Sequence, residues 1–403
     1  MVMGGKGMHH NDRKRKWNNF SKTIPYSLLD VKNELKKKSE KKQLFVKTWK
    51  LTEEETMLIH QIKEQTRKHN KNNVTRTHAY YRFYLQYPEI HWALLGHMVS
   101  RNGGWNMTDL KGELYTRLLS EKDQVTFFSF LERGNWLIFQ DVYPQFLLYE
   151  QSVKKSERLF HLLPYFHVST FMETIWNHFW STGDRYTLAI ATVINEQSYL
   201  EKRVIQNERF KKTVLNSIGF KLYDFFRFNH ILFPFYKDET KQKILLFGDT
   251  MKHFTSLHER ILLGKRLYSL LFRHENALQR VVNWAHDHPH TGSRKDYWPH
   301  LFYDVNESFS RAFYERRIKN CQLRKGADRL YSPRLIYAWK DLHHEEAESE
   351  DWFEDWRIMD YLIDKGEMAD GKIYNEYCKT LEKIEFAILV KKNVLLREEE
   401  GEE

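Results

Sequence analysis

Cysteine is scarce in this chain of 403 residues, which contains only Cys321 and Cys378. Two cysteines are too few for a disulfide framework, and neither lies in a Cys-x-x-Cys motif or near a second cluster of metal ligands. The shortage indicates a reducing compartment, and we therefore predict a cytoplasmic protein.

Long apolar runs are also missing. No run of 18 apolar residues occurs, and the basic N-terminus MVMGGKGMHHNDRKRKW is not followed by an apolar segment. A transmembrane helix needs about 20 mostly apolar residues, and a secretory leader needs an apolar core. The sequence therefore predicts no transmembrane segment and no secretion by a signal peptide.

The common cofactor and metal motifs do not occur either. The chain has no Gly-x-Gly-x-x-Gly and no phosphate loop ending in Gly-Lys-Ser/Thr. Its His-Glu pairs lack the second histidine of a zincin, and it has no Glu-x-x-His, which carboxylate-bridged di-metal bundles need. We therefore predict no cofactor and no metal.

Histidines do gather around the expected loop 287–302, DHPHTGSRKDYWPHLF. Imidazoles at this spacing can share a transition metal, but no cysteine joins them and only Asp287 and Asp296 are nearby carboxylates. A solvated His-rich turn is the simpler interpretation. The Thr-Gly-Ser-Arg-Lys sequence after His290 can instead bind an anion through its hydroxyl and guanidinium groups.

Charge is distributed unevenly. Residues 1–50 carry 14 Lys and Arg against 4 Asp and Glu, whereas residues 343–403 carry 8 against 19. We predict a mobile basic arm with a short helix at residues 1–50, a helical core domain at residues 51–342, and an acidic helical segment at residues 343–403 packed on that core. The arm can attract nucleic acid, anionic lipid, an acidic protein or the chain's own acidic segment.

Apolar residues recur at helical spacing, and no sustained strand alternation bounded by hairpin turns is visible. We therefore predict an all-α fold, a multi-helix globular bundle. Pro144 is expected to kink or break its helix, and the aromatic range 219–236 is expected to form a helix, a break and a loop. The predicted helices cover residues 27–40, 52–68, 88–101, 110–118, 125–131, 135–149, 169–181, 185–209, 254–272, 275–286, 306–322 and 370–397.

The stretch from Val74 to Leu110 combines core packing with polar chemistry. Pro88 can begin a helix and Asn102-Gly103-Gly104 can end it, with His91 near its apolar face. Polar residues then crowd the expected turn before a second helix. These groups can simply hydrogen-bond the helix ends, or they can frame a pocket for an anion or polar substrate, with Arg101 as its charge and His97 or His91 as acid or base.

Three longer motifs together resemble a known family: HWALLGHMVSRNGGWNMTDL, FLERGNWLIFQDVYPQFLLYE, and LGKRLYSLLF followed by HTGSRKDYWPHLF. They resemble the YppC-like family of Bacillus proteins, a domain of unknown function, over roughly residues 50–345. The resemblance implies a cytosolic bacterial setting and no particular mechanism. The polar residues of these motifs are Arg101, Asn102, Asn106, Asp109, Glu132, Asn135, Asp141, Arg294 and Asp296.

Three functional hypotheses follow. The first is a helical protein that binds an anionic macromolecule, nucleic acid or an acidic protein, through its basic arm and basic middle segment. The alternative is a helical enzyme or small-ligand protein with a pocket built from residues 91–109, 132–141 and 290–296. The third is a peripheral membrane protein that inserts the apolar residues of helix 27–40, namely Leu28, Leu29, Val31 and Leu35.

The second hypothesis names specific side chains. Its candidate catalytic residues are His91, His97, Arg101, Asp109, Glu132 and Asp141. Its candidate ligand-binding residues are Arg101, Asn102, Trp105, Asn106, Asn135, His290, Arg294 and Asp296.

Overall fold

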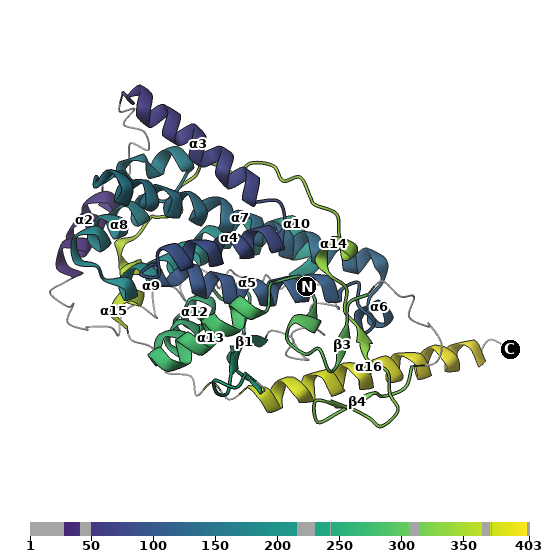
Figure 1. Ribbon diagram of the computed structural model, residues 1–403. Helices are drawn as coiled ribbons and strands as arrows, with labels where there is room; N and C mark the ends of the chain where they lie inside the picture. The colour runs from purple at the N-terminus through teal and green to yellow at the C-terminus, as the bar shows by residue number, and fades with distance from the viewer. Residues whose placement is uncertain are drawn as a thin grey trace, which may run out of the picture.

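Helix α5 (His91–Asp109) is the central element of the fold, and it contacts α4, α7, α9, α12, α14 and strand β1. This is seen in a computed structural model that describes residues 28–40, 50–215, 230–241, 243–305, 314–364, 371 and 373–400 (Figure 1). The architecture is predominantly helical, which confirms the predicted fold class.

The helices before residue 216 form most of the bundle. They are α2 (Leu29–Glu40), α3 (Glu53–His69), α4 (Asn73–Gln86), α5, α6 (Tyr115–Leu118), α7 (Glu121–Lys155), the 3-10 helix η2 (Phe160–Phe166), α8 (Thr170–Thr182), α9 (Arg185–Leu200) and α10 (Glu208–Phe210). Single turns of π-helix follow α9 at Glu201–Ile205 and α10 at Lys211–Leu215.

The second half adds helices around strand pairs. They are α12 (Leu257–Phe272), α13 (Glu275–Asp287), the 3-10 helices η5 (Arg294–Asp296) and η6 (Trp356–Met359), α14 (Leu335–Ala338), α15 (Asp360–Ile363) and α16 (Tyr374–Glu400). Helices α3 and α16 lie at opposite edges of the molecule in Figure 1.

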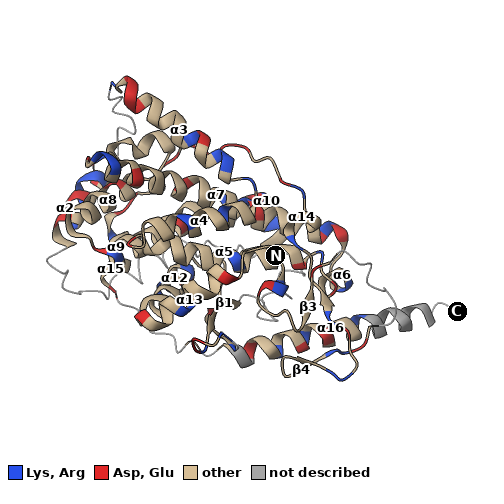
Figure 2. Cartoon of the chain, in the orientation of Figure 1, with Lys and Arg blue, Asp and Glu red and all other residues tan. Residues whose placement is uncertain are grey.

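Helix α3 shows how directly local sequence can determine an element. Thr52 and Glu55 form a capping box at the start of the helix predicted at residues 52–68, in which each side chain bonds the other residue's backbone N–H. Leu58 and Ile62 are buried on one face. The acidic first turn and basic last turn, visible in Figure 2, match the helix dipole.

Helix α5 does not end at Asn102-Gly103-Gly104, so that prediction is wrong. The helix continues to Asp109, and Thr108 lies inside it rather than capping a second helix. The Asn102 side chain instead holds strand β1, because it accepts from Leu232 N at 2.9 Å and donates to Leu232 O at 3.0 Å. The expected turn is therefore a helical surface against which other segments pack.

Helix α7 likewise replaces two predicted helices with one. It runs from Glu121 to Lys155 through Gly134 and Pro144, so neither residue breaks it. A proline inside a helix costs about 3 kcal/mol. Residues 141–149 are all buried, and packing on that scale outweighs the local penalty.

A β-hairpin occupies part of the range for which a loop was predicted. Strands β1 (His230–Tyr236) and β2 (Ile244–Thr250) pair antiparallel, with Phe233 opposite Phe247. Alternation was not visible in the sequence because consecutive residues of β1, such as Leu232 and Phe233, are buried. Two-residue strands also form a parallel pair, β3 (Phe302–Tyr303) with β6 (Leu330–Tyr331), and an antiparallel pair, β4 (Ile318–Lys319) with β5 (Gln322–Leu323).

The two cysteines form a disulfide that the sequence analysis did not predict. Cys321 lies in the turn between β4 and β5, and Cys378 lies on α16. The helix predicted at residues 306–322 is also wrong where the structure describes it, because residues 314–322 form an irregular segment, strand β4 and this turn. The disulfide joins α16 to that hairpin.

Helix α2 is packed on the bundle rather than free. Leu28, Val31 and Leu35 are buried against α8 and η6, so they are not available to insert into a membrane. Lys38 bonds Glu173 at 3.0 Å, and Lys32 lies over the Trp356 ring at 5.1 Å. The described part of the basic arm therefore contacts the acidic C-terminal segment, while residues 1–27 lie outside the described residues.

Candidate functional site

The polar residues of the sequence motifs are mostly buried, but they do not line one cavity. They belong to separate networks, each linking α5 or α7 to a distant part of the chain.

Asp109, at the end of α5, forms a buried ion pair with Arg294. Ser332 donates to the same carboxylate at 3.1 Å, and Arg294 also donates to the Tyr377 hydroxyl. The Arg294 guanidinium lies 4.2 Å from the Trp105 ring centroid. This network is internally compensated, and it joins α5 to α16.

Glu132 on α7 forms a second buried ion pair, with Arg76 of α4 at 2.5 Å. Arg76 also donates to Asn70 at 3.1 Å, and the His344 ring lies 3.7 Å from the carboxylate. Burial raises the pKa of Glu132, but Arg76 and His344 lower it by more, so the group is ionised. The pair joins α4 to α7.

Among the described residues, Asp141 has no cationic partner within salt-bridge distance. Its carboxylate accepts from Asn195 and, at 3.0 Å, from Gln145. Burial raises the pKa of Asp141 to about 7 and that of nearby Glu196 to about 8. Asn195 in turn accepts from Trp352 at 2.8 Å, so the network connects α7 and α9 to the acidic segment.

Other candidates lie apart from these networks. His91 bonds the Tyr268 hydroxyl at 2.9 Å and stacks on Phe272, and burial lowers its pKa to about 4. Asn135 donates to Leu131 O within α7, and Asn106 is half-buried. Neither His91 nor Asp141 lies beside Arg101, so the predicted catalytic set does not converge.

A fourth group does bring two predicted motifs together, and we define it as the Arg101 cluster. It contains His97 and Arg101 from α5, His290 and Asp296 from the loop after α13, and Asn73 and His78 from α4. The pKa values of His78, His97, His290 and Asp296 all respond to the charge of Arg101. Residues 91–109 and 290–296 thus contact each other, whereas the carboxylates Glu132 and Asp141 lie elsewhere.

Arg101 differs from the other buried arginines. Arg76, Arg260 and Arg294 each pair with a carboxylate, but no carboxylate oxygen of a described residue lies within 4.0 Å of Arg101. Its Nη1 donates to His288 O at 2.7 Å, and its Nε and Nη2 have no hydrogen-bond partner among the described residues. The side chain itself is fully buried.

Aromatic rings only partly compensate this charge. The guanidinium lies 4.6 Å from the Trp284 ring centroid and 5.7 Å from that of Tyr297. Cation–π contacts contribute about 2 kcal/mol when desolvated, whereas burying a charge costs several kcal/mol. Arg101 therefore has two nitrogens, Nε and Nη2, that are free to donate within the described chain, and its charge is compensated only by these rings and, beyond salt-bridge distance, by Asp296.

Hydrogen bonds define the tautomers of the two buried histidines. Nδ1 of His97 lies 2.9 Å from Thr77 O and must donate to it, so the lone pair is at Nε2, which has no partner in the described chain. Asn73 donates its amide to Ser100 O, so its Oδ1 accepts from His290 Nε2 at 2.8 Å. The lone pair of His290 Nδ1 then lies 3.7 Å from Asp296 Oδ2.

Burial largely determines which groups of the Arg101 cluster are charged. Burial and Arg101 hold the pKa of His97 well below its usual range, and burial lowers that of His290 to about 4. Both rings are neutral at pH 7. Burial also raises the pKa of Asp296, but His290 and Arg101 lower it by more, so the carboxylate is ionised.

The loop that carries His290 and Asp296 is held firmly. Thr291 donates to Asp296 from both its N–H and its hydroxyl, each at 2.8 Å. Thr108 of α5 donates to Gly292 O at 2.6 Å. A Cβ on Gly104 would lie 2.5 Å from both Asn73 Oδ1 and His290 Nε2, so only glycine permits this approach to α5.

Sequence reasoning missed the α4 members of these networks. Asn73 directly precedes the stretch from Val74 to Leu110, and Arg76 and Thr77 lie at its start, in NVTRTH. They read as ordinary polar residues of an exposed face, but all three are buried. Polar residues one turn apart in an otherwise aromatic helix were the signal that could have identified them.

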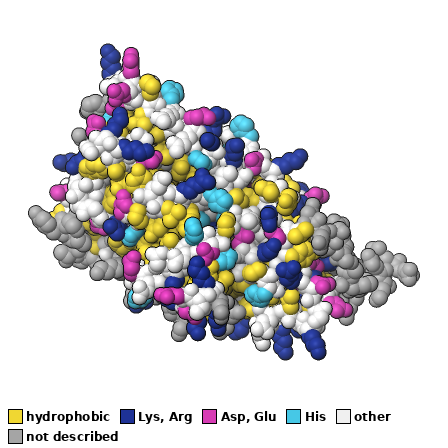
Figure 3. Space-filling model, viewed as in Figure 1, with side chains coloured by type: hydrophobic (Ala, Val, Ile, Leu, Met, Phe, Trp, Pro, Cys, Tyr) yellow, Lys and Arg dark blue, Asp and Glu magenta, His cyan; other side chains and the backbone are white. Residues whose placement is uncertain are grey.

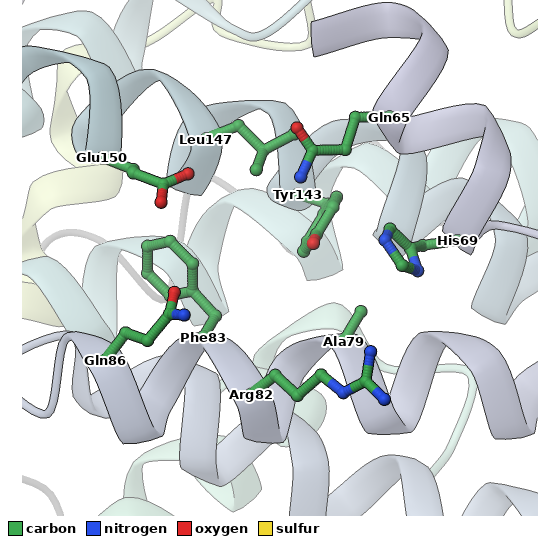
Figure 4. Close-up of a pocket in the computed structure, with 9 residues that line it drawn as sticks. All are labelled: Gln65, His69, Ala79, Arg82, Phe83, Gln86, Tyr143, Leu147 and Glu150. Carbon is green, nitrogen blue, oxygen red and sulfur yellow. The ribbon is translucent and has the colours of Figure 1, made fainter.

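A cavity of about 230 Å³ lies elsewhere, between α3, α4 and α7 (Figure 4). No predicted site residue lines it. His69 and Arg82 lie near one end in Figure 4, Gln86 and Glu150 lie near the other, and Phe83 lies between. Glu150 bonds Lys154 at 2.9 Å, which compensates its charge.

Within the described part of the chain, no group of three or more His, Cys, Asp or Glu side chains is arranged to hold a metal ion. Nor does that part contain a helix with the length and apolar character needed to cross a membrane. On the face shown in Figure 3, histidines, charged side chains and apolar side chains are interspersed.

The protein is predominantly helical, and the polar residues of its three sequence motifs form buried networks. The chain belongs to the family described as a protein of unknown function, DUF2515, which matches residues 68–375 and so includes the whole Arg101 cluster. It is similar to the uncharacterized protein YppC of Bacillus subtilis (strain 168), with 45% identity over 239 residues that cover 59% of this chain and 72% of that protein. The predicted resemblance is thus confirmed. No solved structure matches the chain.

Proposed function

We propose that the protein binds a small ligand through an anionic group and that Arg101 receives this group. The observation that carries the proposal is the absence of a carboxylate partner for Arg101 among the described residues, although the other buried arginines all have one. An anion would compensate the buried charge and bond the two free N–H edges.

The arrangement suits an oxyanion for a second reason. A guanidinium bonds two oxygens of a phosphate or carboxylate in parallel, and rings that stack against its faces keep it in place. In this site Trp284 and Tyr297 flank Arg101, and His288 O fixes one of its nitrogens. His78 is half-buried, which supports access for a small ion from its side.

The test is calorimetric titration of the full chain with inorganic phosphate at constant ionic strength. We expect Arg101→Met to lower the phosphate affinity at least tenfold, because charge-assisted hydrogen bonds contribute about 1.5 to 3 kcal/mol. Arg82→Met is the matched control, since Arg82 lies on the separate cavity. If the Arg82 variant alone lost phosphate, the anion would bind in that cavity and the proposal would be wrong.

Residues 1–50 support a second candidate function, the binding of an anionic macromolecule. Their composition carries it, with 14 basic against 4 acidic residues. Lys37 of α2 is exposed, although Lys32 and Lys38 already contact the C-terminal segment and α8. Phosphate contacts by Lys and Arg give binding that weakens steeply with salt.

This candidate is tested by nucleic-acid retention across a salt series. Changing the Arg-Lys-Arg-Lys run at residues 13–16 to glutamine should reduce both affinity and salt dependence. The control replaces exposed lysines elsewhere, namely Lys122, Lys154, Lys155 and Lys212. Equal loss in both variants would indicate an effect of net charge rather than of the arm.

A further inference from the structure

The Arg101 cluster offers hydrogen-bond acceptors as well as donors. Arg101 Nε and Nη2 are free donors in the described chain, while His97 Nε2 and His290 Nδ1 carry lone pairs without a partner. Asp296 adds an ionised carboxylate beside His290. A ligand that satisfies this set must therefore be anionic on one side and donate a proton on the other.

From this complementarity we propose that the site selects an oxyanion that retains a hydroxyl group, of which hydrogen phosphate is the simplest. The inference rests on the proposed anion-binding function and adds the class of anion. The deprotonated oxygens bond Arg101, and the single P–OH proton is donated to one of the acceptors on His97, His290 or Asp296. Sulfate has only acceptors at neutral pH, so it meets these lone pairs without a proton to share.

The positions of the acceptors are fixed before any ligand arrives. Both oxygens of Asp296 already accept from Thr291, and His290 is oriented by Asn73. Ser293 of the same loop bonds Ser332 O at 2.6 Å. Side chains held in this way cannot turn their lone pairs away from a sulfate, and specificity against the wrong anion depends on such unrelieved repulsion.

The expected preference for phosphate over sulfate follows from the cost of a buried acceptor that lacks a donor. Leaving a buried acceptor without a donor costs about 1 to 3 kcal/mol. One missing P–OH donor therefore corresponds to a preference of about tenfold for phosphate over sulfate, since 1.4 kcal/mol is tenfold. Asp296→Asn should lower that preference, because the amide N–H can donate to sulfate where the carboxylate cannot.

The experiment compares the two anions by calorimetric titration at pH 7 and equal ionic strength. Wild type should bind phosphate about tenfold more tightly than sulfate, Asp296→Asn should bring the ratio toward one, and Arg101→Met should weaken both. The wild-type comparison needs no variant, so it stands even if Asp296→Asn folds poorly.

The results that would contradict the inference differ from those that would contradict the proposed function. Equal binding of phosphate and sulfate, both lost in Arg101→Met, would overturn the selectivity and leave Arg101 as an anion site. Binding of neither anion, or binding unaffected by Arg101→Met, would overturn both. Selectivity for phosphate that depends on Arg101 and Asp296 supports both.

Discussion

Gly104 is a residue of α5 against which the loop of the Arg101 cluster packs without room for a Cβ. We expect Gly104→Ala to destabilise the protein by about 1 to 3 kcal/mol, because the new Cβ would lie 2.5 Å from Asn73 Oδ1 and His290 Nε2. The measurement is the free energy of unfolding in urea.

Gly134→Ala provides the matched control for this substitution. Gly134 also lies inside a helix, α7, but its Cβ would meet nothing within 4 Å. Alanine should therefore stabilise the protein by about 0.5 to 1 kcal/mol through helix propensity. A Gly104 variant as stable as the Gly134 variant would contradict the close contact.

Arg101→Met and Arg76→Met should change the stability of the protein by very different amounts. Arg76→Met leaves Glu132 buried without its cation, which costs about 3 to 5 kcal/mol. Arg101→Met strands no carboxylate within salt-bridge distance, and it removes the cost of burying a charge. We therefore expect about 1 kcal/mol of change or less from Arg101→Met, measured by urea denaturation without added phosphate. A loss as large as that of Arg76→Met would mean that the protein itself compensates Arg101.

Helices and strands were predictable from the sequence where the local sequence signals agree with the packing of the folded protein. The capping box of α3 and the boundary of α8 after Ser169 follow from side-chain chemistry within one turn. The failures share one cause. Pro144, Asn102-Gly103-Gly104 and strand β1 all carry local signals that contacts with distant segments override.

Helix α16 depends on a covalent contact that its own sequence does not reveal. Cys378 on the helix bonds Cys321 across 57 residues of chain. Closing a loop of that length stabilises a protein by about 2 to 4 kcal/mol. We therefore expect reductant to lower the free energy of unfolding by that amount, measured with and without dithiothreitol.

The double variant Cys321→Ser/Cys378→Ser is the control for this prediction. It should match the reduced protein and show no response to dithiothreitol. If both thiols of the folded wild type react with a thiol reagent under non-reducing conditions, the disulfide is absent.

At the scale of the whole molecule, the candidate site was predictable in part. The motifs of α5 and of residues 290–296 meet, because Thr108, Arg101 and Gly104 all touch the loop. Glu132 and Asp141 are drawn to other partners. Spacing within a helix determines which side chains share a face, but it does not determine which distant segment packs there.

The acidic C-terminal segment contacts basic residues along its path. Lys202 bonds Glu350 and Glu354, and Arg203 donates to the backbone carbonyls of Glu348 and Glu350. The division into a core domain at residues 51–342 and an acidic segment at residues 343–403 remains a prediction. Trp352 also reaches into the Asp141 network, so the segment contributes to the buried core as well as to surface ion pairs.

Buried titratable groups of two kinds make stability depend on pH in opposite directions. The neutral histidines His97 and His290 have folded pKa values below their usual 6.5. The unfolded chain therefore binds more protons below pH 6.5, and the free energy of unfolding falls as the pH drops. Asp141 and Glu196 have folded pKa values of about 7 and about 8, above their ordinary 3.8 and 4.5. The folded protein holds protons that the unfolded chain has lost, so stability decreases as pH rises through this window.

Below pH 6.5 the two histidines and the two acids shift the free energy of unfolding in opposite directions and largely cancel, so stability should vary little there and should decline as the pH rises above 6.5 and the histidine contribution ends. Above about pH 7.5 the histidines contribute no slope, because they are neutral in both the folded and the unfolded state. Asp141→Asn imitates the protonated acid and should flatten this decline, with a gain on the order of 4 kcal/mol at pH 8. Urea denaturation at several pH values measures this decline.

The control, Glu132→Gln, should destabilise the protein at every pH because it leaves Arg76 buried without its anionic partner. An unchanged slope in Asp141→Asn would show that Asp141 is ionised inside the folded protein.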